Sequence, residues 1–388
     1  MTACITGWSH APFGKAEDSD VEALIARVAT DALADAELSP EDVDAIYLGW
    51  YNGGFSKQDF GASLVMNALP GLRYKPATRV ENACATGSAA VHQGLNFIEA
   101  GQGRTVLVIG VEKMTATPGP EIGGILLQAA YLKEEGETEG GFAGVFGQIC
   151  NGYFQKHGDQ SDALAMIAAK NHKNGCANPY AQMRRDLGFD FCRTESDKNP
   201  VVAGPLKRTD CSLVSDGAAA LVLRDMDGAL ASKKAVAFRS RAQVNDFLPM
   251  SKRDMTGLDG CGRAWDKALK AARLDLMDLD FVETHDCFTI AELMQMEAMG
   301  LAAPGQAGKA VMDGVTQRDG TLPINLSGGL KAKGHPIGAT GVSMHVLTAM
   351  QVRGEAGDMQ LKGAEIGGIF NMGGAAVANY CSILQAIR

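Results

Sequence analysis

Two distant stretches of this 388-residue chain repeat the same local pattern, and that repetition restricts the fold more than composition does. An extended segment ends in Asn82-Ala83-Cys84 and passes into a helix expected over Thr86 to Ala100, which is rich in small residues. Strand-like residues 281–284 lead in the same way through His285-Asp286-Cys287 into a helix expected over Thr289 to Met299. Two fused, duplicated halves are the simplest explanation of this repeat.

The wider hydrophobic pattern predicts an α/β fold. Short apolar or β-branched runs, such as Ala45 to Trp50 and Thr105 to Val111, alternate with amphipathic segments such as Asp59 to Leu69. A strand rich in glycine and alanine is expected to close each half, at residues 215–222 and 371–378. The two closing strands therefore agree with a duplicated architecture.

The same pattern indicates where the chain divides. We expect an N-terminal half over residues 1–230 and a C-terminal half over residues 231–388. Between about residues 115 and 205 the pattern loosens into loops that contain proline and glycine, with one helix expected over Ser161 to Gly175. We interpret this region as an insertion in the first half, where substrate-binding loops are commonly found on α/β scaffolds.

Composition indicates an ordinary globular protein and excludes several other classes. Hydrophobic residues make up 46% and charged residues 21% of the chain, which excludes a disordered or fibrous protein. A formal net charge of -9 disfavours nucleic acid as the main partner, because phosphate binding needs a surplus of Lys and Arg. No apolar stretch is long enough to cross a bilayer, so we expect no membrane span.

The chain ends and the cysteines favour a cytoplasmic location. Residues 1–7 lack the basic flank and long apolar run of a secretory leader, and residues 385–388 are not a peroxisomal signal. The nine cysteines are scattered without a C-x-x-C pair. We therefore expect reduced thiols rather than a disulfide framework.

Cys84 is the first candidate catalytic residue. A thiol at a helix N-terminus lies near free N–H groups with partial positive charge, which should lower its pKa and increase the thiolate fraction. Its small neighbours, among them Ala83, Ala85 and Gly87, would keep the sulfur accessible. A buried structural cysteine is the competing interpretation.

His335 is the candidate general base. It lies between Gly334 and Pro336, ahead of a helix that residues 338–341 would begin, so the backbone would fix its position. Such a histidine suits a base that must meet a thiol at hydrogen-bond distance. A turn histidine without a catalytic role is the alternative.

Cys287 and His285 add a second thiol and a second imidazole at the other strand-to-helix turn. If a pseudo-twofold axis relates the halves, Cys84 and Cys287 occupy equivalent positions and can face one pocket. Alternatively, Cys287 is a core residue and His285 forms a hydrogen bond at the start of a helix.

The segment over residues 370–375 is a candidate oxyanion-binding turn. Its glycines, including Gly373, can bring a backbone N–H group close to a reacting carbonyl, often beside the N–H of the nucleophile. The alternative is an ordinary strand pair in which glycine allows close packing.

The remaining motifs do not predict a metal or nucleotide site. The Cys and His residues lack the paired spacing of a structural zinc site, although residues 285–287 could in principle offer ligands. Neither a G-x-G-x-x-G nor a G-K-[ST] loop is present. The histidines to which we assign no catalytic role are His92 and His345 on helices, and His10, His157 and His172 at the surface or in loops.

Together these motifs resemble the thiolase family over essentially the whole chain. Residues 82–87 look like the nucleophile motif, residues 334–338 look like the G-H-P-x-G base motif, and residues 285–288 look like an H-D-C-F segment. Residues 170–180 are similar to the sterol-carrier-protein-type thiolases and their archaeal relatives. The resemblance is specific because several separate motifs carry it.

One departure from most thiolases places this chain in that branch. Degradative and biosynthetic thiolases carry the asparagine of an N-E-A-F segment where this chain has His285, and a C-x-G cysteine where it has Asn371. In the branch that the chain resembles, Cys287 takes the acid/base task of that cysteine. Ketoacyl synthases fit less well because they would show a second catalytic histidine, and hydroxymethylglutaryl-CoA synthases because they need a Glu base.

The resemblance implies a fold and a mechanism. The fold would have two duplicated α/β halves in α-β-α-β-α layers with an inserted loop domain. Cys84 would carry the acyl group after His335 accepts its proton, and Cys287 would move the α-proton of a second acyl-CoA. His335 and a water held by His285 would stabilise the enolate oxygen, while the N–H groups of Cys84 and Gly373 would bind the acyl oxygen.

Expected substrates and partners also come from the resemblance. Coenzyme A thioesters are substrates, with no separate cofactor and no metal, and Ser212 matches a position that contacts the pantetheine arm. Homodimers or homotetramers are usual, and some archaeal relatives need a small OB-fold partner protein. An aldolase-like lyase on side-chain CoA esters and a non-catalytic lipid-binding or scaffold subunit are the alternatives.

Basic residues in or just beyond the insertion have two interpretations. They either meet the phosphates of the CoA nucleotide or lie on a solvated loop. These residues are Lys170, Lys173, Arg184, Arg185, Lys207 and Arg208.

Overall fold

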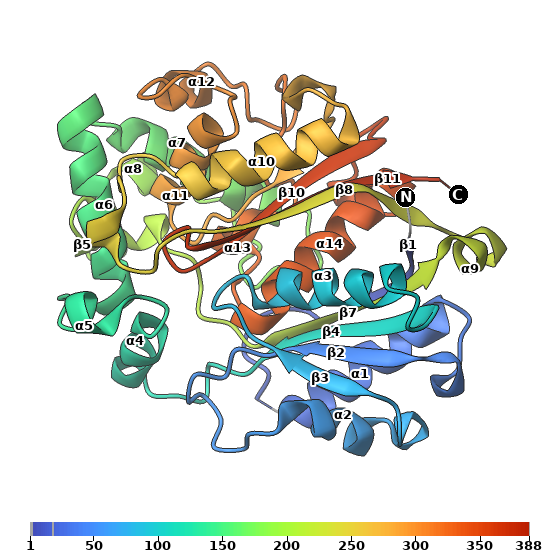
Figure 1. Ribbon diagram of the computed structural model, residues 1–388. Helices are drawn as coiled ribbons and strands as arrows, with labels where there is room; N and C mark the ends of the chain where they lie inside the picture. The colour runs from blue at the N-terminus through green and yellow to red at the C-terminus, as the bar shows by residue number, and fades with distance from the viewer. Residues whose placement is uncertain (1–2, 18, 388) are drawn as a thin grey trace.

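The computed structural model describes residues 3–17 and 19–387 and shows α/β layers built around a mixed sheet (Figure 1). Met1, Thr2 and Arg388, which belong to the chain ends considered above, lie outside the described residues. Among the described residues, nine strands form this sheet in the order β3-β2-β4-β7-β1-β8-β11-β10-β9. The strands are β1 (Ala3–His10), β2 (Ala45–Gly49), β3 (Ala77–Val80), β4 (Thr105–Glu112), β7 (Gly217–Asp225), β8 (Val236–Asn245), β9 (Phe281–Glu283), β10 (Ile366–Gly373) and β11 (Ala378–Ala386).

The two ends of this sheet repeat one strand arrangement. In the first half, β2 runs parallel to β3 and β4, and β7 and β1 follow as antiparallel strands. In the second half, β9 runs parallel to β10, and β11 and β8 follow as antiparallel strands. Ile324 forms a parallel bridge with Val282 of β9, in the place that β3 occupies beside β2. The halves join where β1 pairs with β8.

This arrangement corrects the expectation that the two thiols occupy equivalent positions. The strand order makes β9 the counterpart of β2, and the segment at Ile324 the counterpart of β3. Cys84 follows β3, whereas Cys287 follows β9, so the counterpart of the Cys84 turn is the segment that leads from Ile324 through α13 to His335. The sequence hides this difference because both turns follow an apolar strand, and a local pattern does not reveal which strands pair.

Helices and sheet alternate as α-β-α-β-α layers (Figure 1). The central helices α3 and α14 pack against each other between the two parts of the sheet, α1 covers the outer face of the first half, and α10 covers that of the second. The helices of the two halves are α1 (Val21–Asp35), α2 (Gly61–Ala68), α3 (Thr86–Glu99), α9 (Met226–Ala231), α10 (Asp259–Ala272), α11 (Thr289–Ala298), α12 (Ala307–Met312), α13 (Gly329–Ala332) and α14 (Ile337–Arg353).

A mainly helical region lies between β4 and β7, to one side of the layers (Figure 1). Its elements are α4 (Gly119–Leu127), α5 (Leu132–Glu135), α6 (Gly141–His157), α7 (Ser161–Gly175), α8 (Phe189–Arg193), and the paired strands β5 (Val201–Ala203) and β6 (Leu206–Lys207). The expected helix over Ser161 to Gly175 is therefore confirmed. Among the described residues, no helix is both long enough and apolar enough to cross a bilayer.

Strand β4 shows why the layers form. All its residues are buried, and its apolar side chains alternate between two cores. Leu107, Ile109 and Val111 belong to the core under α1, while Val106 and Val108 belong to the core that includes α3 and α14. A strand covered on both faces needs a continuous apolar run, as the sequence shows here.

Glycines allow the central layer to form close to the sheet. A Cβ atom added to Gly87 of α3 would lie 2.7 Å from the main-chain nitrogen of Gly341 in α14. One added to Gly110 of β4 would lie 2.6 Å from the carbonyl oxygen of Gly338. Backbone contacts at these positions bring the beginning of α14, and with it His335, beside the beginning of α3.

Candidate active site

Cys84 lies in a tight turn between β3 and α3. Ala83 has a left-handed backbone (φ +47°), which costs an L-residue roughly 1–2 kcal/mol. Thr86 holds this turn, because its Oγ1 accepts from the N–H of Asn82 at 2.9 Å and donates to the carbonyl of Ala83 at 2.6 Å. Cys84, which lies within this turn, is only 6% exposed.

The Cys84 thiol is neutral at rest, which corrects the expected lowering of its pKa. Burial raises the pKa of Cys84 to about 12, although the backbone N–H groups of Gly374 and of Cys84 itself act in the opposite direction. Desolvation of a thiolate outweighs the helix N-terminus at this depth. A nucleophilic thiolate therefore forms only when a base accepts the thiol proton during the reaction.

His335 is prepared to accept that proton. Its Nδ1 lies 2.7 Å from Oγ1 of Thr340, and this hydroxyl donates its own proton to the carbonyl of Pro336 at 3.0 Å. The Thr340 oxygen must then accept from Nδ1–H, which leaves a lone pair on Nε2. Within residues 3–17 and 19–387, Nε2 has no hydrogen-bond partner. Burial, with a smaller effect of Lys333, lowers the pKa of His335 to about 3, so the ring is neutral.

Asn371 gives His285 the opposite tautomer. Its Nδ2 donates to the carbonyl of Cys84 at 3.1 Å and lies 2.9 Å from Nδ1 of His285. Because the carbonyl only accepts, the amide must present its NH₂ group, and Nδ1 of His285 is the acceptor of the second hydrogen. Burial lowers the pKa of His285 well below its ordinary value, so this ring is neutral with its proton on Nε2.

The Cys84 thiol and the two imidazoles lie together. The Cys84 sulfur and one ring nitrogen each of His285 and His335 lie within 4.8 Å of one another, and the two rings meet edge to face at 5.1 Å. A tetrahedral zinc ion would bring such donors to roughly 3.5 Å from one another and would need a bare nitrogen on both rings. The hydrogen bond from Asn371 leaves His285 with a protonated Nε2 instead, so the set suits proton transfer better than metal binding.

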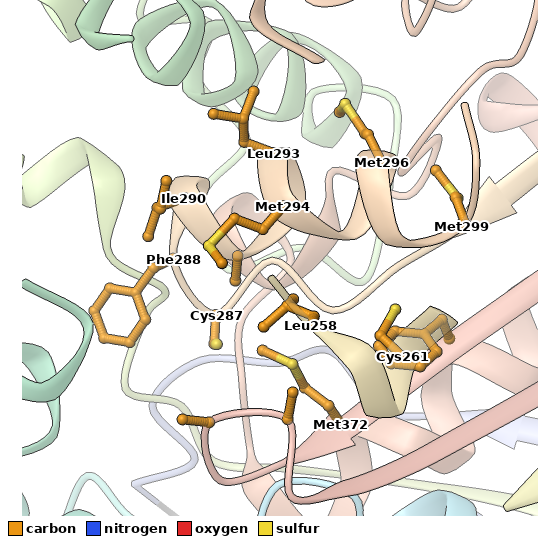
Figure 2. Close-up of a cluster of buried hydrophobic side chains, with 14 of the residues drawn as sticks. Leu258, Cys261, Cys287, Phe288, Ile290, Leu293, Met294, Met296, Met299 and Met372 are labelled. Carbon is orange, nitrogen blue, oxygen red and sulfur yellow. The ribbon is translucent and has the colours of Figure 1, made fainter. Parts of the chain in front are cut away.

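Cys287 approaches the same site from the turn between β9 and α11. Cys287 is buried, and its carbonyl accepts a hydrogen bond from the N–H of Ser212 at 2.9 Å. Burial raises the pKa of the Cys287 thiol well above its ordinary value, and the neighbouring Cys84 adds a smaller effect in the same direction. Figure 2 shows Cys287 among the side chains of a hydrophobic cluster, with Phe288 on one side of it and Met372 on the other. Cys287 is therefore a neutral thiol beside apolar side chains.

Both thiols and His335 line one cavity of about 240 Å³. Its walls are mostly apolar and come from the inserted region and the H-D-C-F turn, and they consist of Met114, Leu126, Phe142, Ala143, Val202, Leu213, Val214 and Phe288. Arg208, Cys211 and Ser212 complete the lining. The structure thus places the predicted residue Ser212 at the cavity and adds Cys211, which the sequence pattern did not distinguish from the other thiols.

Gly373 lies beside the nucleophile turn as the last residue of β10. A Cβ atom at this position would lie 2.3 Å from the carbonyl oxygen of Asn82, so only glycine allows the two segments to meet. The next residue, Gly374, has a left-handed backbone (φ +62°) and directs its N–H toward the Cys84 sulfur. The glycine turn predicted from the sequence therefore reaches the nucleophile, with Gly374 as an additional donor.

The structure corrects both interpretations offered for two of the basic residues. Lys170 is buried and pairs with Glu292 at 2.5 Å, and Lys207 is buried and pairs with Asp210 at 3.2 Å. Neither lysine is available to a phosphate or lies on a solvated loop. The exposed members of the set are Lys173, Arg184, Arg185 and Arg208, and of these Arg208 lines the cavity.

Two histidines also differ from their expected locations. His10 lies in β1 and His172 in α7, and both are buried, whereas the sequence interpretation placed them at the surface or in loops. His10 is held by the carbonyl of Ala11 and the hydroxyl of Ser343, each at 2.7 Å. The local sequence around His10 does not reveal a partner as distant as Ser343.

Comparisons with known proteins give one consistent result. A family model described as "Thiolase, N-terminal domain" matches residues 3–227, and one described as "Thiolase C-terminal domain-like" matches residues 242–386. The chain is 36% identical to an acetyl-CoA acetyltransferase of Methanothermobacter thermautotrophicus, over 95% of this chain and 96% of that protein. It is 31% identical to sterol carrier protein 2 of Homo sapiens, over 94% of this chain and 68% of that protein.

Solved structures share the fold at lower sequence identity. The Ltp2-ChsH2(DUF35) aldolase superimposes with a TM-score of 0.83 at 20% identity, covering 100% of this chain and 98% of that chain. Human mitochondrial 3-ketoacyl-CoA thiolase in complex with CoA gives a TM-score of 0.76 at 17% identity, with the same coverage.

Proposed function

Because the chain belongs to the thiolase family, we propose that it transfers acyl groups between coenzyme A thioesters through an acyl-enzyme on Cys84. The observation that carries this proposal is the pairing of a neutral, buried thiol with an imidazole whose Nε2 is free to accept its proton. Such a pair generates the nucleophile only when a substrate carbonyl is present, which suits covalent acyl transfer.

In the first half-reaction, the Cys84 sulfur attacks the carbonyl carbon of a thioester or a 3-ketoacyl-CoA while Nε2 of His335 accepts the thiol proton. The backbone N–H groups of Cys84 and Gly373 are the proposed donors to the developing oxyanion, and Gly374 directs a third N–H toward the sulfur. Collapse of the intermediate leaves the acyl group on sulfur. The leaving group is CoA thiolate in the synthetic direction and the enolate of acetyl-CoA in the degradative direction.

In the second role, Cys287 moves a proton at carbon. It removes the α-proton of a second acyl-CoA in condensation, and it protonates the acetyl-CoA enolate in cleavage. The Nε2–H of His285, whose tautomer Asn371 sets, supports a direct or water-mediated hydrogen bond to the enolate oxygen. His335 supplies a second donor once it is protonated.

We also propose which residues bind coenzyme A and how the protein assembles. Ser212 would contact the pantetheine arm and Arg208 the nucleotide phosphates, since both line the cavity. We also propose a homodimer or homotetramer in the cytoplasm, as is usual for relatives of this kind. The structural similarity to the Ltp2-ChsH2(DUF35) aldolase supports testing for a small OB-fold partner protein. We further propose a division of the chain into halves over 1–230 and 231–388, which the repeated strand order supports to the extent that one repeat ends with β7 and the other begins with β8.

Mass analysis after incubation with acetyl-CoA and longer acyl-CoAs tests the proposal. We expect an acyl adduct on the peptide that contains Cys84, and the dependence of adduct formation on chain length would define the substrate. A protein that forms no adduct with any acyl-CoA would contradict the acyl-enzyme and favour the lyase or scaffold alternatives.

A further inference from the structure

Glu112 is a buried carboxylate to which the sequence motifs assign no role. It is the last residue of β4 and is fully buried. Its Oε2 accepts from the main-chain N–H groups of Tyr51 at 3.1 Å and Gly338 at 3.0 Å, and its Oε1 accepts from the N–H of Asn52 at 3.1 Å. One side chain thus joins the segment after β2 to the beginning of α14.

The bond to Gly338 completes the N-terminus of α14. The first N–H groups of a helix lack partners within the helix, and Pro336, which precedes α14, provides no side-chain cap. Glu112 supplies the acceptor from a different layer, and its negative charge also suits the helix dipole. A Cβ atom on Gly338 would lie 2.3 Å from the carbonyl oxygen of Val111, so the helix start is pressed against the end of β4.

The segments that Glu112 holds are those that surround the nucleophile. Tyr51 and Ile337 form a small hydrophobic cluster with Cys84 and Met114, on the first-half side of the site. Gly338 directly follows Ile337, and His335 lies only a few residues before it. A shift at the start of α14 would therefore change the separation between the His335 imidazole and the Cys84 sulfur.

We propose that Glu112 is a positioning residue that sets the contact between His335 and Cys84 by holding the start of α14 and the segment after β2 together. It does not touch the reacting atoms. The inference rests on the proposed roles of Cys84 as nucleophile and His335 as base, and it names a carboxylate that controls how well they meet.

This carboxylate also gives the site a distinct dependence on pH. Burial raises the pKa of Glu112 to about 7, against the opposing effects of its three N–H donors and of Arg79 on β3. When the Glu112 carboxyl is protonated, one of its oxygens becomes a donor that faces a main-chain N–H group. The hydrogen bonds that hold the segment after β2 to the start of α14 are then weakened. Of the other titratable groups around it, Tyr51 and Cys84 have pKa values raised far above neutrality, and His335 has a pKa lowered to about 3.

The test measures alkylation of Cys84 by iodoacetamide, followed on the Cys84 peptide by mass spectrometry, in the full chain and in Glu112→Gln. The reaction needs the thiolate but no acyl-CoA. Because the thiolate fraction of Cys84 falls with pH in both proteins, the informative quantity is the ratio of their rates at each pH. Above about pH 7 the unsubstituted protein should react about 10 to 100-fold faster than Glu112→Gln, because small misplacements of catalytic groups have effects of this size. This advantage should fall as pH decreases through about 7, where Glu112 becomes neutral like the Gln. An unchanged rate with the same pH dependence in Glu112→Gln would overturn the proposal.

Two further variants separate positioning from general stability. Glu112→Asp keeps the charge on a shorter arm, so it should show an intermediate rate, and its advantage over Glu112→Gln should also fall near neutral pH. It also carries the test if Glu112→Gln does not fold, since an Asp variant with the full rate would equally contradict the role. Glu135→Gln is a matched control, because Glu135 is another buried carboxylate that accepts from two main-chain N–H groups, those of Tyr131 and Met250. It should leave Cys84 alkylation unchanged.

Failure of this inference can be told apart from failure of the proposed function. If Glu112→Gln slows alkylation as expected but acetyl-CoA leaves no adduct on Cys84, the positioning role stands and the acyl-enzyme does not. If acetyl-CoA acylates Cys84 equally fast in both proteins, the acyl-enzyme stands and the role of Glu112 is wrong.

Discussion

The turn after β3 and the turn after β9 each present a buried thiol, but their surroundings differ. Burial raises the pKa of both Cys84 and Cys287. Cys84 also has an imidazole with a free lone pair beside it and an N–H of Gly374 directed at its sulfur. Cys287 lies among the apolar side chains of a hydrophobic cluster (Figure 2). From these surroundings we propose different tasks for two identical side chains, covalent attack for Cys84 and proton transfer for Cys287.

Replacing Cys84 should have the largest effect. Cys84→Ala removes the atom that carries the acyl group, so both thiolysis and condensation should fall by about 10⁴-fold or more. Steady-state assays in both directions provide the measurement. Cys4→Ala is the matched control, because Cys4 is an equally buried thiol in β1, and it should retain normal activity. Substantial activity of Cys84→Ala would contradict the assignment of acyl transfer to the turn after β3.

Removal of His335, the proposed base, should reduce acylation of Cys84 almost as strongly as removal of Cys84 itself. In His335→Ala no group accepts the proton of a thiol whose pKa is raised to about 12, so acylation should slow by about 10² to 10⁴-fold. Rapid-quench measurement of the Cys84 adduct would show this directly. Raising the pH should partly restore the rate in this variant, because hydroxide then forms the thiolate. A rate that is unaffected at neutral pH would show that Cys84 needs no base.

The two histidine tautomers can be tested separately. Thr340→Val keeps the shape of the side chain but removes the acceptor for Nδ1–H of His335, so acylation should fall about tenfold. Asn371→Ala removes the donor to Nδ1 of His285, so the carbon–carbon step should fall by a similar factor while acylation changes less. Comparison of single-turnover acylation with overall condensation distinguishes the two outcomes. Equal losses in both steps for both variants would contradict the separate roles.

The smallest expected effect concerns the charge of Cys84 in the resting protein, which can be measured by thiolate absorbance. Because burial raises its pKa to about 12 and lowers that of His335 to about 3, the pair should be neutral across the physiological range. The difference in ultraviolet thiolate absorbance between the unmodified protein and Cys84→Ala should therefore be close to zero at neutral pH. A clear thiolate band there would indicate a resting ion pair instead.

The sequence predicted the family, the fold and the residues that meet at the site. Those predictions depend on local motifs, and the comparisons confirm the thiolase family and its layered fold. The equivalence of Cys84 and Cys287 was wrong because strand pairing is not a local property. The lowered pKa of Cys84 was wrong because burial, which is set by distant segments, outweighs the helix N-terminus.

Residues that act through the backbone were the hardest to predict. Glu112 ends an apolar strand, and nothing in its own segment indicates that its carboxylate reaches Gly338 in the other half. Thr340 lies one helical turn beyond Pro336, and its spacing from His335 could have suggested a contact across the helix start. Lys170 was expected either near phosphates or on a solvated loop, because its partner Glu292 lies far along the chain and is not apparent from the local sequence.

The most direct test of the division between the two thiols is the fate of acetyl-CoA on Cys287→Ser. We predict that intact-mass and peptide analysis will show an acetyl group on Cys84, formed at a rate close to that of the unsubstituted protein, with no condensation product. Condensation at the normal rate, or absence of the adduct on Cys84, would contradict the assignment of one thiol to acyl transfer and the other to proton transfer.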